Sequence, residues 1–512
     1  ENVPGKVNMY TCGPTVYHFA HIGNLRSYIM EDVLEKHLRY SGYDVKRVMN
    51  ITDVGHLSSD ADTGEDKMVK GAKRENKTVM DIARFYTEAF FKDCEKLNIK
   101  VPDVVEPATN CIKEFIDMVQ GLIEKDYAYL AGGNVYFDTS KLDEYYVFNK
   151  HDIDELMVGV REGVEEDTNK RNKNDFVLWF TKSKFEEQAL KWDSPWGVGY
   201  PGWHIECSAI SLKHLGEYLD IHCGGIDNAF PHHTNEIAQS EAYIGHKWCN
   251  YWFHVLHLNT NSGKMSKSTG EFLTVSLLEE KGYNPLAYRF FCLQSHYRKQ
   301  LVFSYENLDG AATAYDKLFK KIAGLNPVDS DELDMAAVEK LQGAFKAALD
   351  NDINTSLAVT AIYDVLKEKT NDKTKIYLLN DFDRVLSLDI ERIRKTLDTT
   401  SKEDFNRAVE KIINCNAIYI IGARSAAPLA SFLNYYFTMI FPNVRLIRNT
   451  TTSEIFEQVM HIGKGDVIIG ISFPRYSKHT AKILEYANNN GANVIAITDS
   501  VDSPLAQYAD NL

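Results

Sequence analysis

The stretch Val7-Asn8-Met9-Tyr10-Thr11-Cys12-Gly13-Pro14 decides the fold at the start of this chain. Val7 to Tyr10 predicts a short strand, and Thr11 to Pro14 predicts a turn. Residues 27–41 then have the spacing of an amphipathic helix, and residues 45–49 predict a second strand. Because a strand, a helix and a strand follow one another, we expect a parallel sheet and an α/β domain.

The rest of the chain divides by its pattern. Residues 120–200 are rich in Gly and charge and predict an insertion, and strand character returns at residues 220–225. From Tyr305 apolar residues recur at helical spacing: they are Leu308, Ala311, Ala312, Tyr315, Leu318, Phe319 and Ile322, then Val338, Leu341, Phe345 and Leu349. Beyond residue 390 the apolar runs 417–422, 466–472 and 493–499 predict buried parallel strands, each followed by a helix.

Composition narrows the class of protein. A length of 512 residues corresponds to about three domains. No run of about eighteen apolar residues and no secretion signal occur, so no membrane span is expected. Eight scattered cysteines favour reduced thiols in the cytoplasm. A net charge of −15 argues against an indiscriminate polyanion binder but is compatible with a tRNA ligand. We expect truncation at both ends, because the chain starts at Glu1 and ends in an unfinished element.

Four residues far apart in the sequence form a candidate zinc site: Cys12, Cys207, His232 and Glu236. His232 and Glu236 are four apart, so on a helix starting near Pro231 they share one face. The two cysteines are expected to reach the site from loops at strand ends. Two thiolates, an imidazole and a carboxylate suit zinc. Spacing alone does not distinguish these four residues from buried residues with a purely structural role. Three nearby residues are alternative ligands, and we expect them to pack around the site instead: His222, Cys223 and His233.

Two motifs suit phosphate chemistry. His21-Ile22-Gly23-Asn24 stands where a helix begins after a strand and turn, where backbone N–H groups and the helix dipole attract anions. Gly23 allows a close backbone approach. Lys264-Met265-Ser266-Lys267-Ser268 lies between glycines, and its lysines suit a pyrophosphate leaving group. Each motif also has an alternative interpretation without function. The first could be a chance tetrapeptide, and the second could be a solvated basic loop.

Residues 4–390 closely resemble cysteinyl-tRNA synthetases, which are class I aminoacyl-tRNA synthetases. The resemblance rests on long ordered stretches: residues 9–17, Asn50-Ile51-Thr52-Asp53, Asp175 to Trp179, Ser194 to Gly197, Pro201 to Ala209, Phe230 to His233, and Lys264 to Ser268. It implies a Rossmann-like catalytic domain over 1–302, with an insertion at about 115–200 and the lysine-motif region at 260–302, followed by a helical domain over 303–390.

The resemblance also implies the roles of particular residues. Zinc is expected on Cys12, Cys207, His232 and Glu236, where it binds the substrate thiolate. ATP with Mg²⁺ is expected at His21, Gly23, Asn24, Lys264 and Lys267, and cysteine at Thr15, Thr52, Trp203 and Asp227. Asn24 departs from the usual His of the first motif, but an amide still donates to phosphate, so we expect retained activity.

Residues 395–512 resemble the sugar isomerase (SIS) domain of phosphosugar-sensing transcription regulators. The resemblance rests on Ile421 to Ser425, Ile471 to Ser477, Ile497 to Ser500 and Ser503 to Ala506. It implies a doubly wound, apparently truncated α/β domain that binds a sugar phosphate and is able to dimerise. Its candidate ligands are Ser425, Ser472, Ser477 and Thr480, for which helix capping is the alternative role. The chain is thus expected to be a fusion, natural or artefactual, joined near residues 388–398.

Three hypotheses of function follow. The first is a cytoplasmic cysteine–tRNA ligase with tRNA(Cys), L-cysteine and ATP as partners and a monomeric synthetase part. The second is a ligase that joins activated cysteine to an amino sugar at the same site, against which the helical region and His296-Tyr297-Arg298 favour tRNA. The third is a phosphosugar sensor whose synthetase part is not catalytic, which the intact set of metal and lysine motifs disfavours.

Overall fold

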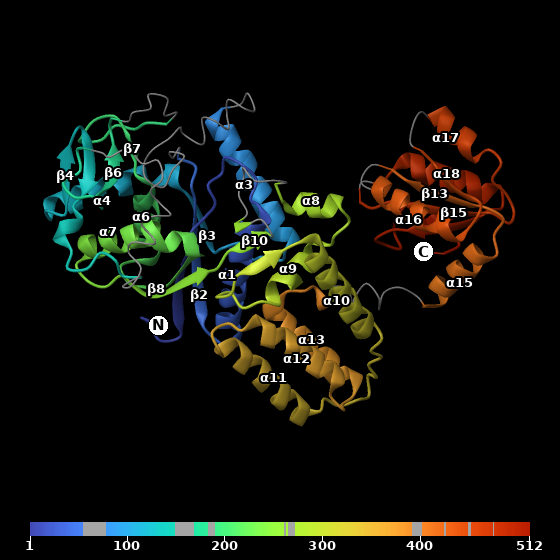
Figure 1. The fold of residues 1–512 in the computed structure, drawn as a ribbon. Helices are drawn as coiled ribbons and strands as arrows, with labels where there is room; N and C mark the ends of the chain where they lie inside the picture. Colours follow the sequence, from blue (N-terminus) through green and yellow to red (C-terminus); the bar gives the residue numbers. More distant parts are fainter. Residues whose placement is uncertain are drawn as a thin grey trace. The chain divides into compact units, whose positions relative to one another are not determined.

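The computed structural model describes residues 1–54, 78–148, 168–182, 190–260, 263–264, 272–391, 402–423, 426–448, 452–474 and 476–511. The chain forms two compact units, Glu1–Glu391 and Arg392–Leu512, which are described separately (Figure 1). Among the described helices, none is long and apolar enough to cross a bilayer.

A five-stranded parallel sheet of order β3-β2-β1-β8-β9 organises the first unit. Its strands are β1 (Lys6–Thr11), β2 (Asp44–Ile51), β3 (Val104–Pro107), β8 (Leu219–Gly225) and β9 (Cys249–Val255). The helices that flank it are α1 (Ile22–Tyr40), α3 (Val79–Lys96), α6 (Trp203–Leu215) and α7 (Thr234–Ile244). The order changes direction between β1 and β8, and ligands bind at such a point, beyond the carboxyl ends of the strands.

The insertion is a small antiparallel sheet. Helix α4 (Ile112–Glu124) precedes strands β4 (Ala128–Ala131), β5 (Asn134–Phe137), β6 (Phe176–Phe180) and β7 (Tyr200–Pro201), which pair in sequence order. Phe176, Leu178 and Trp179 share one buried core with Ile205 and Cys207 of α6. The insertion is therefore packed onto the helix that carries one candidate ligand.

Helices complete the first unit, as predicted from residue 305 on. They are α8 (Val275–Glu280), α9 (Pro285–Leu293), α10 (Tyr305–Ala323), α11 (Met335–Asp350), α12 (Thr355–Lys367) and α13 (Asp372–Leu386). Every predicted core position of α10 and α11 is buried except Ala312, which is half-buried. A three-stranded sheet of β10 (Leu258–Thr260), β11 (Gly263–Lys264) and β12 (Leu301–Phe303) joins them to the parallel sheet region.

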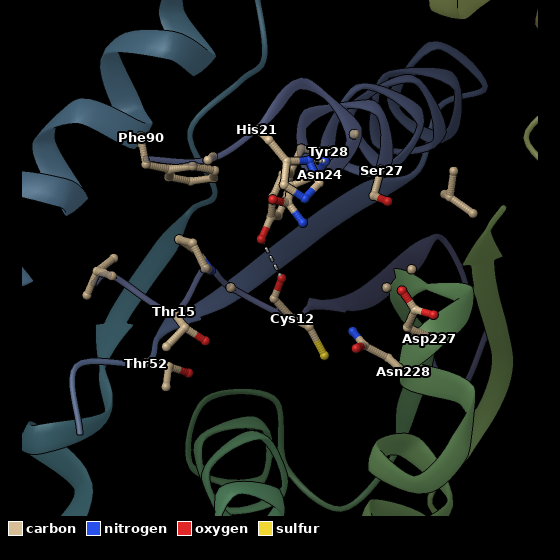
Figure 2. Close-up of a pocket in the computed structure, with 18 of the residues that line it drawn as sticks. Cys12, Thr15, His21, Asn24, Ser27, Tyr28, Thr52, Phe90, Asp227 and Asn228 are labelled. Atoms are coloured by element: carbon tan, nitrogen blue, oxygen red, sulfur yellow. Dashed lines mark hydrogen bonds between the residues drawn. The ribbon is translucent and has the colours of Figure 1, made fainter. Parts of the chain in front are cut away.

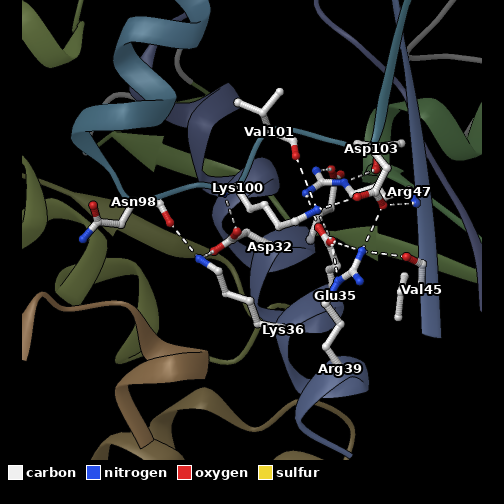
Figure 3. A network of polar contacts seen from close by, with 12 residues as sticks. Asp32, Glu35, Lys36, Arg39, Val45, Arg47, Asn98, Lys100, Val101 and Asp103 are labelled. Atoms are coloured by element: carbon white, nitrogen blue, oxygen red, sulfur yellow. Dashed lines mark hydrogen bonds and ion pairs between the residues drawn. The ribbon is translucent and has the colours of Figure 1, made fainter. Parts of the chain in front are cut away.

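Buried charges connect α1 to its neighbours (Figure 3). Arg289 of α9 is fully buried and lies 2.7 Å from the Asp32 carboxylate of α1. The same guanidinium donates to the carbonyls of Leu97 and Leu386. On the sheet side, Arg47 lies 3.2 Å from Glu35. These pairs hold α1, whose first turn borders the site, against β2 and the helical part.

The second unit is a parallel sheet of order β14-β13-β15-β16. The strands are β13 (Ile418–Gly422), β14 (Val444–Leu446), β15 (Val467–Ile471) and β16 (Asn493–Ile497). Helices α15 (Lys402–Ile413) and α16 (Ala427–Ile440) contribute to one of its two cores, and α17 (Thr452–Val459) and α18 (Lys478–Asn489) to the other. This arrangement matches the doubly wound prediction.

One expected helix of the second unit is wrong. A helix was predicted after the run 493–499, but the described residues that follow β16, up to Asn511, form the 3-10 turn Ala506–Tyr508 and no α-helix. The chain instead turns back, so that Asn511 forms a bridge with Ile495, and the Asn511 carbonyl accepts from the Ala496 N–H. These backbone bonds satisfy groups on the outer edge of β16.

Candidate active site and metal centre

A cavity of about 400 Å³ lies at the carboxyl edge of the parallel sheet (Figure 2). It is lined by the turn after β1, the starts of α1 and α6, the carboxyl end of β2, part of α3, and the segments that follow β8 and β9. Ten predicted site residues line it: Cys12, Thr15, His21, Gly23, Asn24, Thr52, Trp203, Cys207, Asp227 and His232. The fold thus brings together residues that are up to about two hundred positions apart.

The four candidate ligands converge on one point. Their ligand atoms all lie within 4.8 Å of one another, and the set is almost completely enclosed. Cys12 Sγ is 4.0 Å from Cys207 Sγ, and Cys207 Sγ is 3.5 Å from His232 Nε2. His232 Nε2 is 3.0 Å from Glu236 Oε1. Soft thiol ligands together with an imidazole are the donors that zinc prefers.

The turn after β1 positions Cys12. Its N–H donates to the Cys223 carbonyl of β8, and the Asn50 side chain accepts from the Gly13 N–H at 2.8 Å. A Cβ at Gly13 would lie 1.6 Å from the Asn50 carbonyl oxygen, so only glycine fits this close approach of two chain segments. The turn is therefore packed directly against the end of β2.

The expectation that Cys207 comes from a loop is wrong. Cys207 lies in the second turn of α6, which begins at Trp203 directly after β7. Helix α6 packs against the parallel sheet, so Cys207 is buried and only 2% exposed. His232 and Glu236 do share one face, as predicted, although α7 itself begins at Thr234 and His232 lies in the π-helical turn Ala229–His233 before it.

Two of the three rival ligands surround the same point. His222 Nε2 lies 2.8 Å from Glu236 Oε2, and His233 Nε2 lies 3.3 Å from Cys12 Sγ. A second compact donor set therefore exists, made of Cys12, His222, His233 and Glu236. Cys223 belongs to neither set. The two sets share Cys12 and Glu236, so a metal bound there would have imidazoles on more than one side.

The electrostatics of the four ligands are set by burial and by the ion pairs of Glu236. Burial disfavours the Glu236 carboxylate, but His222 and His232 outweigh it and lower the pKa of Glu236 to about 2. Burial likewise disfavours the charged His232, yet Glu236 and Cys207 raise its pKa to about 10. Glu236 Oε1 accepts no aligned hydrogen bond from any described residue, although His232 is near. This oxygen is compensated by the charge of His232 at 3.0 Å, and it keeps lone pairs that are able to bind a cation.

The start of α1 forms the second part of the site. His21 is the N-cap residue, and its Nδ1 accepts from the Asn24 N–H at 3.1 Å. Nδ1 as acceptor puts the proton of the neutral ring on Nε2. Backbone N–H groups at this helix start were predicted to be available to a phosphate. The Ile22 N–H is not, because it donates to the Leu273 carbonyl. A Cβ at Gly23 would lie 2.9 Å from the His21 ring, so a larger residue here would force the His21 side chain to move.

The four residues expected to bind cysteine lie near the donors. The Trp203 ring stacks on the His232 ring, with centroids 4.3 Å apart. Thr52 is buried, and its hydroxyl donates to Glu206 at 3.0 Å. Thr15 forms a bridge with Thr52 across the sheet edge. Asp227 lies 3.2 Å from His257 and is half exposed toward the cavity.

Comparisons with known proteins agree with this arrangement. Residues 1–313 match the family described as tRNA synthetases class I (C) catalytic domain, and residues 411–512 match the SIS domain. A cysteine–tRNA ligase of Treponema denticola is 48% identical over 407 residues, which are 75% of this chain and 82% of that protein. A cysteine–tRNA ligase of Borreliella burgdorferi is 44% identical over 422 residues, 79% of this chain and 88% of that protein. The chain belongs to the cysteine–tRNA ligase family.

Membership of this family of aminoacyl-tRNA synthetases confirms the α/β fold class and the resemblance found in the sequence. The relatives do not favour the amino-sugar ligase or the non-catalytic sensor. For the second unit, a solved structure of the sugar isomerase domain of an RpiR transcription factor from Sphaerobacter thermophilus is 29% identical. The match covers 24% of this chain and 69% of the solved chain, with a TM-score of 0.23.

Two predicted residues of this family member fall outside the described chain. Lys267 and Ser425 lie there, and of Lys264 only the backbone is described, as the end of β11. In the second unit Ser472 follows β15, and its hydroxyl accepts from the Ser477 N–H. Ser477 caps α18 by accepting from the Thr480 N–H. Ser477 therefore has the capping role that was the alternative for these residues.

Three polar residues around the ligands were missed in the sequence. Tyr28 donates from its hydroxyl to the Cys12 carbonyl at 3.2 Å (Figure 2). Asn50 contacts Gly13, Thr52 and Cys207 at once. Glu206 holds Thr52. Both Asn50 and Glu206 lie within the motifs that carry the family resemblance. Asn50 is at the end of a strand and Glu206 is next to Cys207, and these positions could have indicated a place near the site.

Proposed function

We propose that the chain is a cysteine–tRNA ligase that activates L-cysteine with ATP and transfers it to tRNA(Cys). The observation that carries the proposal is the convergence of two thiols, an imidazole and an ionised carboxylate on one buried point beside a helix N-terminus. A thiol-binding metal next to an anion-binding helix start is what activation of cysteine by ATP requires.

The metal of this proposal is zinc on Cys12, Cys207, His232 and Glu236. The chemistry of the donors fits zinc, and the Glu236 oxygen without an aligned hydrogen bond supports a cation at this point. When bound, zinc supplies a Lewis acid that stabilises the side chain of cysteine as thiolate and so separates cysteine from serine. His222 holds the second oxygen of Glu236 at 2.8 Å and so orients that ligand.

The protein's own residues position the reacting groups. His21 Nε2–H and the Asn24 amide are suited to donate to the phosphates of ATP at the positive end of α1. Thr15, Thr52, Trp203 and Asp227 are suited to surround the cysteine backbone, with Asp227 toward its ammonium group. In the first step the cysteine carboxylate attacks the α-phosphorus and pyrophosphate leaves, and Lys264 and Lys267 are the residues we propose to stabilise this leaving group. Mg²⁺ accompanies ATP.

In the second step a terminal ribose hydroxyl of tRNA(Cys) attacks the carbonyl carbon of cysteinyl-adenylate, and AMP leaves. Neither step needs a strong general base, so positioning and electrostatic stabilisation dominate. These substrates place the proposed activity in the cytoplasm.

The test is cysteine-dependent exchange of pyrophosphate into ATP by the purified chain. We expect exchange with cysteine, at least ~100-fold less with serine, and loss of exchange after zinc chelation that added zinc reverses. Exchange that is indifferent to chelation would refute the zinc site. The acceptor is tested separately: tRNA(Cys) should consume the adenylate and an amino sugar should not.

For the second unit we propose a sugar phosphate as ligand, held at Ser425, Ser472, Ser477 and Thr480. Ser472 and Ser477 lie where β15 leads into α18, and the start of a helix favours a phosphate. The Thr480 hydroxyl is buried and without a hydrogen bond from the described residues. Thermal unfolding with a panel of sugar phosphates tests this, and no stabilisation by any of them would refute it.

A further inference from the structure

Arg26 carries a buried charge that has no part in the steps described above. It lies in the second turn of α1, shortly after the motif residue Asn24, and its side chain is completely buried. Arg47 and Arg289 are also completely buried, but each pairs with a carboxylate of α1. Among the described residues, no Asp or Glu pairs with Arg26. Because burying a charge is costly unless it is compensated, the contacts of this guanidinium need an explanation.

Four backbone carbonyls take the place of a carboxylate. The Nη1 atom of Arg26 donates to the carbonyls of Leu256 and His257, to the second of them at 2.8 Å. The Nη2 atom donates to the carbonyls of His296 and Lys299, to the second of them at 2.7 Å. The first pair of carbonyls follows β9, and the second pair precedes β12. A guanidinium presents its donors in a rigid planar fork, so this one side chain joins two separate segments to α1.

The segment bound by Nη1 forms one wall of the active-site cavity. His257 and Leu258 both line the cavity. The His257 side chain lies 3.2 Å from Asp227, the residue proposed to face the cysteine ammonium group. A Cβ at Gly23 of the first motif would lie 3.6 Å from the Leu258 side chain, so this wall also adjoins the start of α1. The guanidinium therefore fixes the backbone of a wall that contacts two parts of the site.

The same segment continues into β10, which contacts α1 and determines where the first lysine of the lysine motif lies (Figure 1). Strand β10 pairs with β11, so that Asn259 lies opposite Lys264. On its other side β10 pairs with β12, and the Leu301 N–H donates to the His257 carbonyl. Arg26 thus binds the backbone just before β10 and just before β12. A shift of β10 away from α1 would move the Lys264 backbone relative to the helix start.

We propose that Arg26 is a positioning residue for the activation of cysteine: it fixes β10 and β11 against α1 so that Lys264 reaches the pyrophosphate leaving group. This inference rests on the proposed function. Arg26 contacts no substrate in this proposal and acts only through the backbone of β10. A misplacement of about 1 Å can cost ~10²-fold in rate, so loss of the fork should lower kcat. The zinc ligands lie on other elements and should stay in place.

The experiment compares Arg26→Lys with the matched control Arg289→Lys in cysteine-dependent pyrophosphate exchange by the full chain. Arg289 is equally buried and also donates to backbone carbonyls, those of Leu97 and Leu386, but it lines no part of the cavity. Both variants keep the charge and lose the fork. For Arg26→Lys we expect kcat to fall at least ~10-fold, with the KM for cysteine and the zinc content within about twofold of native. Arg289→Lys should keep the native kcat per zinc-containing chain, which corrects for any unfolded protein.

A double-mutant cycle tests whether Arg26 acts through Lys264. Lys264→Ala should lower kcat by itself, and adding Arg26→Lys to it should then cost less than ~3-fold, because residues that act as a unit are not additive. A native kcat in Arg26→Lys, an equal loss in Arg289→Lys, or the full loss from Arg26→Lys in both backgrounds would overturn this inference and leave the proposed function standing. A native chain without any exchange would instead refute the proposed function, and this inference with it.

Discussion

The replacement Cys207→Ala should remove the metal while leaving the fold intact. Cys207 Sγ lies 4.0 Å from Cys12 Sγ and 3.5 Å from His232 Nε2, so its loss opens one corner of the donor set. Loss of a residue that merely orients a ligand typically weakens metal binding by 10- to 100-fold. Loss of a ligand itself should cost more, so we expect metal affinity and pyrophosphate exchange to fall by more than ~100-fold.

The matched control is Cys223→Ala. Cys223 is also fully buried in the same sheet region but belongs to neither donor set. Each replacement removes one sulfur from a packed interior, at a cost on the order of 1 kcal/mol in unfolding free energy, so after zinc has been removed the two variants should be equally stable. Any difference in metal content between them therefore reports the site and not the core.

The assays are zinc per chain after dialysis and cysteine-dependent exchange, with urea unfolding to compare stabilities. Native protein and Cys223→Ala should retain one zinc, and Cys207→Ala should lose it together with exchange. Full zinc content in Cys207→Ala would refute the assignment of this ligand. Equal loss of zinc from both variants would show that packing, not ligation, controls the metal.

Three other predictions concern α1. Asn24→Ala should lower the exchange rate by ~10²-fold, and Asn24→His should restore it, because either side chain donates to phosphate; an unchanged rate in the alanine variant would argue against the contact. Asp32→Asn leaves buried Arg289 without its carboxylate and should cost about 3–5 kcal/mol in urea unfolding. Lys36 and Arg289 outweigh burial and lower the pKa of Asp32. The contribution of Asp32 to the free energy of unfolding is therefore present above the pKa of the unfolded chain and is lost as pH falls through the lower folded pKa. If the destabilisation by Asp32→Asn were as large in acid as at neutral pH, this reasoning would be contradicted. Burial raises the pKa of Glu31 to about 8 despite Arg47, so the folded chain should lose stability as pH rises from about 4.5 to 8. Glu31→Gln should make the free energy of unfolding depend less on pH over this range. An unaltered pH dependence would exclude Glu31 as its source.

The outline of both units follows from local pattern. Apolar runs at 417–422 and 466–472 became central parallel strands because residues buried on both faces of a sheet must be apolar throughout. The helical spacing from Tyr305 predicted the buried side of α10. The missing helix after β16 shows the limit of such reasoning, since backbone bonds to Asn511 took its place.

By itself, the sequence determined the residue types of the site, the motif order, and the pairing of His232 with Glu236 on one helical face. These depend on spacing of a few residues, which backbone geometry translates directly into space. Only the tertiary structure decided that Cys207 reaches the site from α6, that two further imidazoles surround the donors, and that Asn50 supports the turn at Gly13. Cys12 and Cys207 are 195 residues apart, and their contact depends on how sheet and helices pack, which no local spacing encodes.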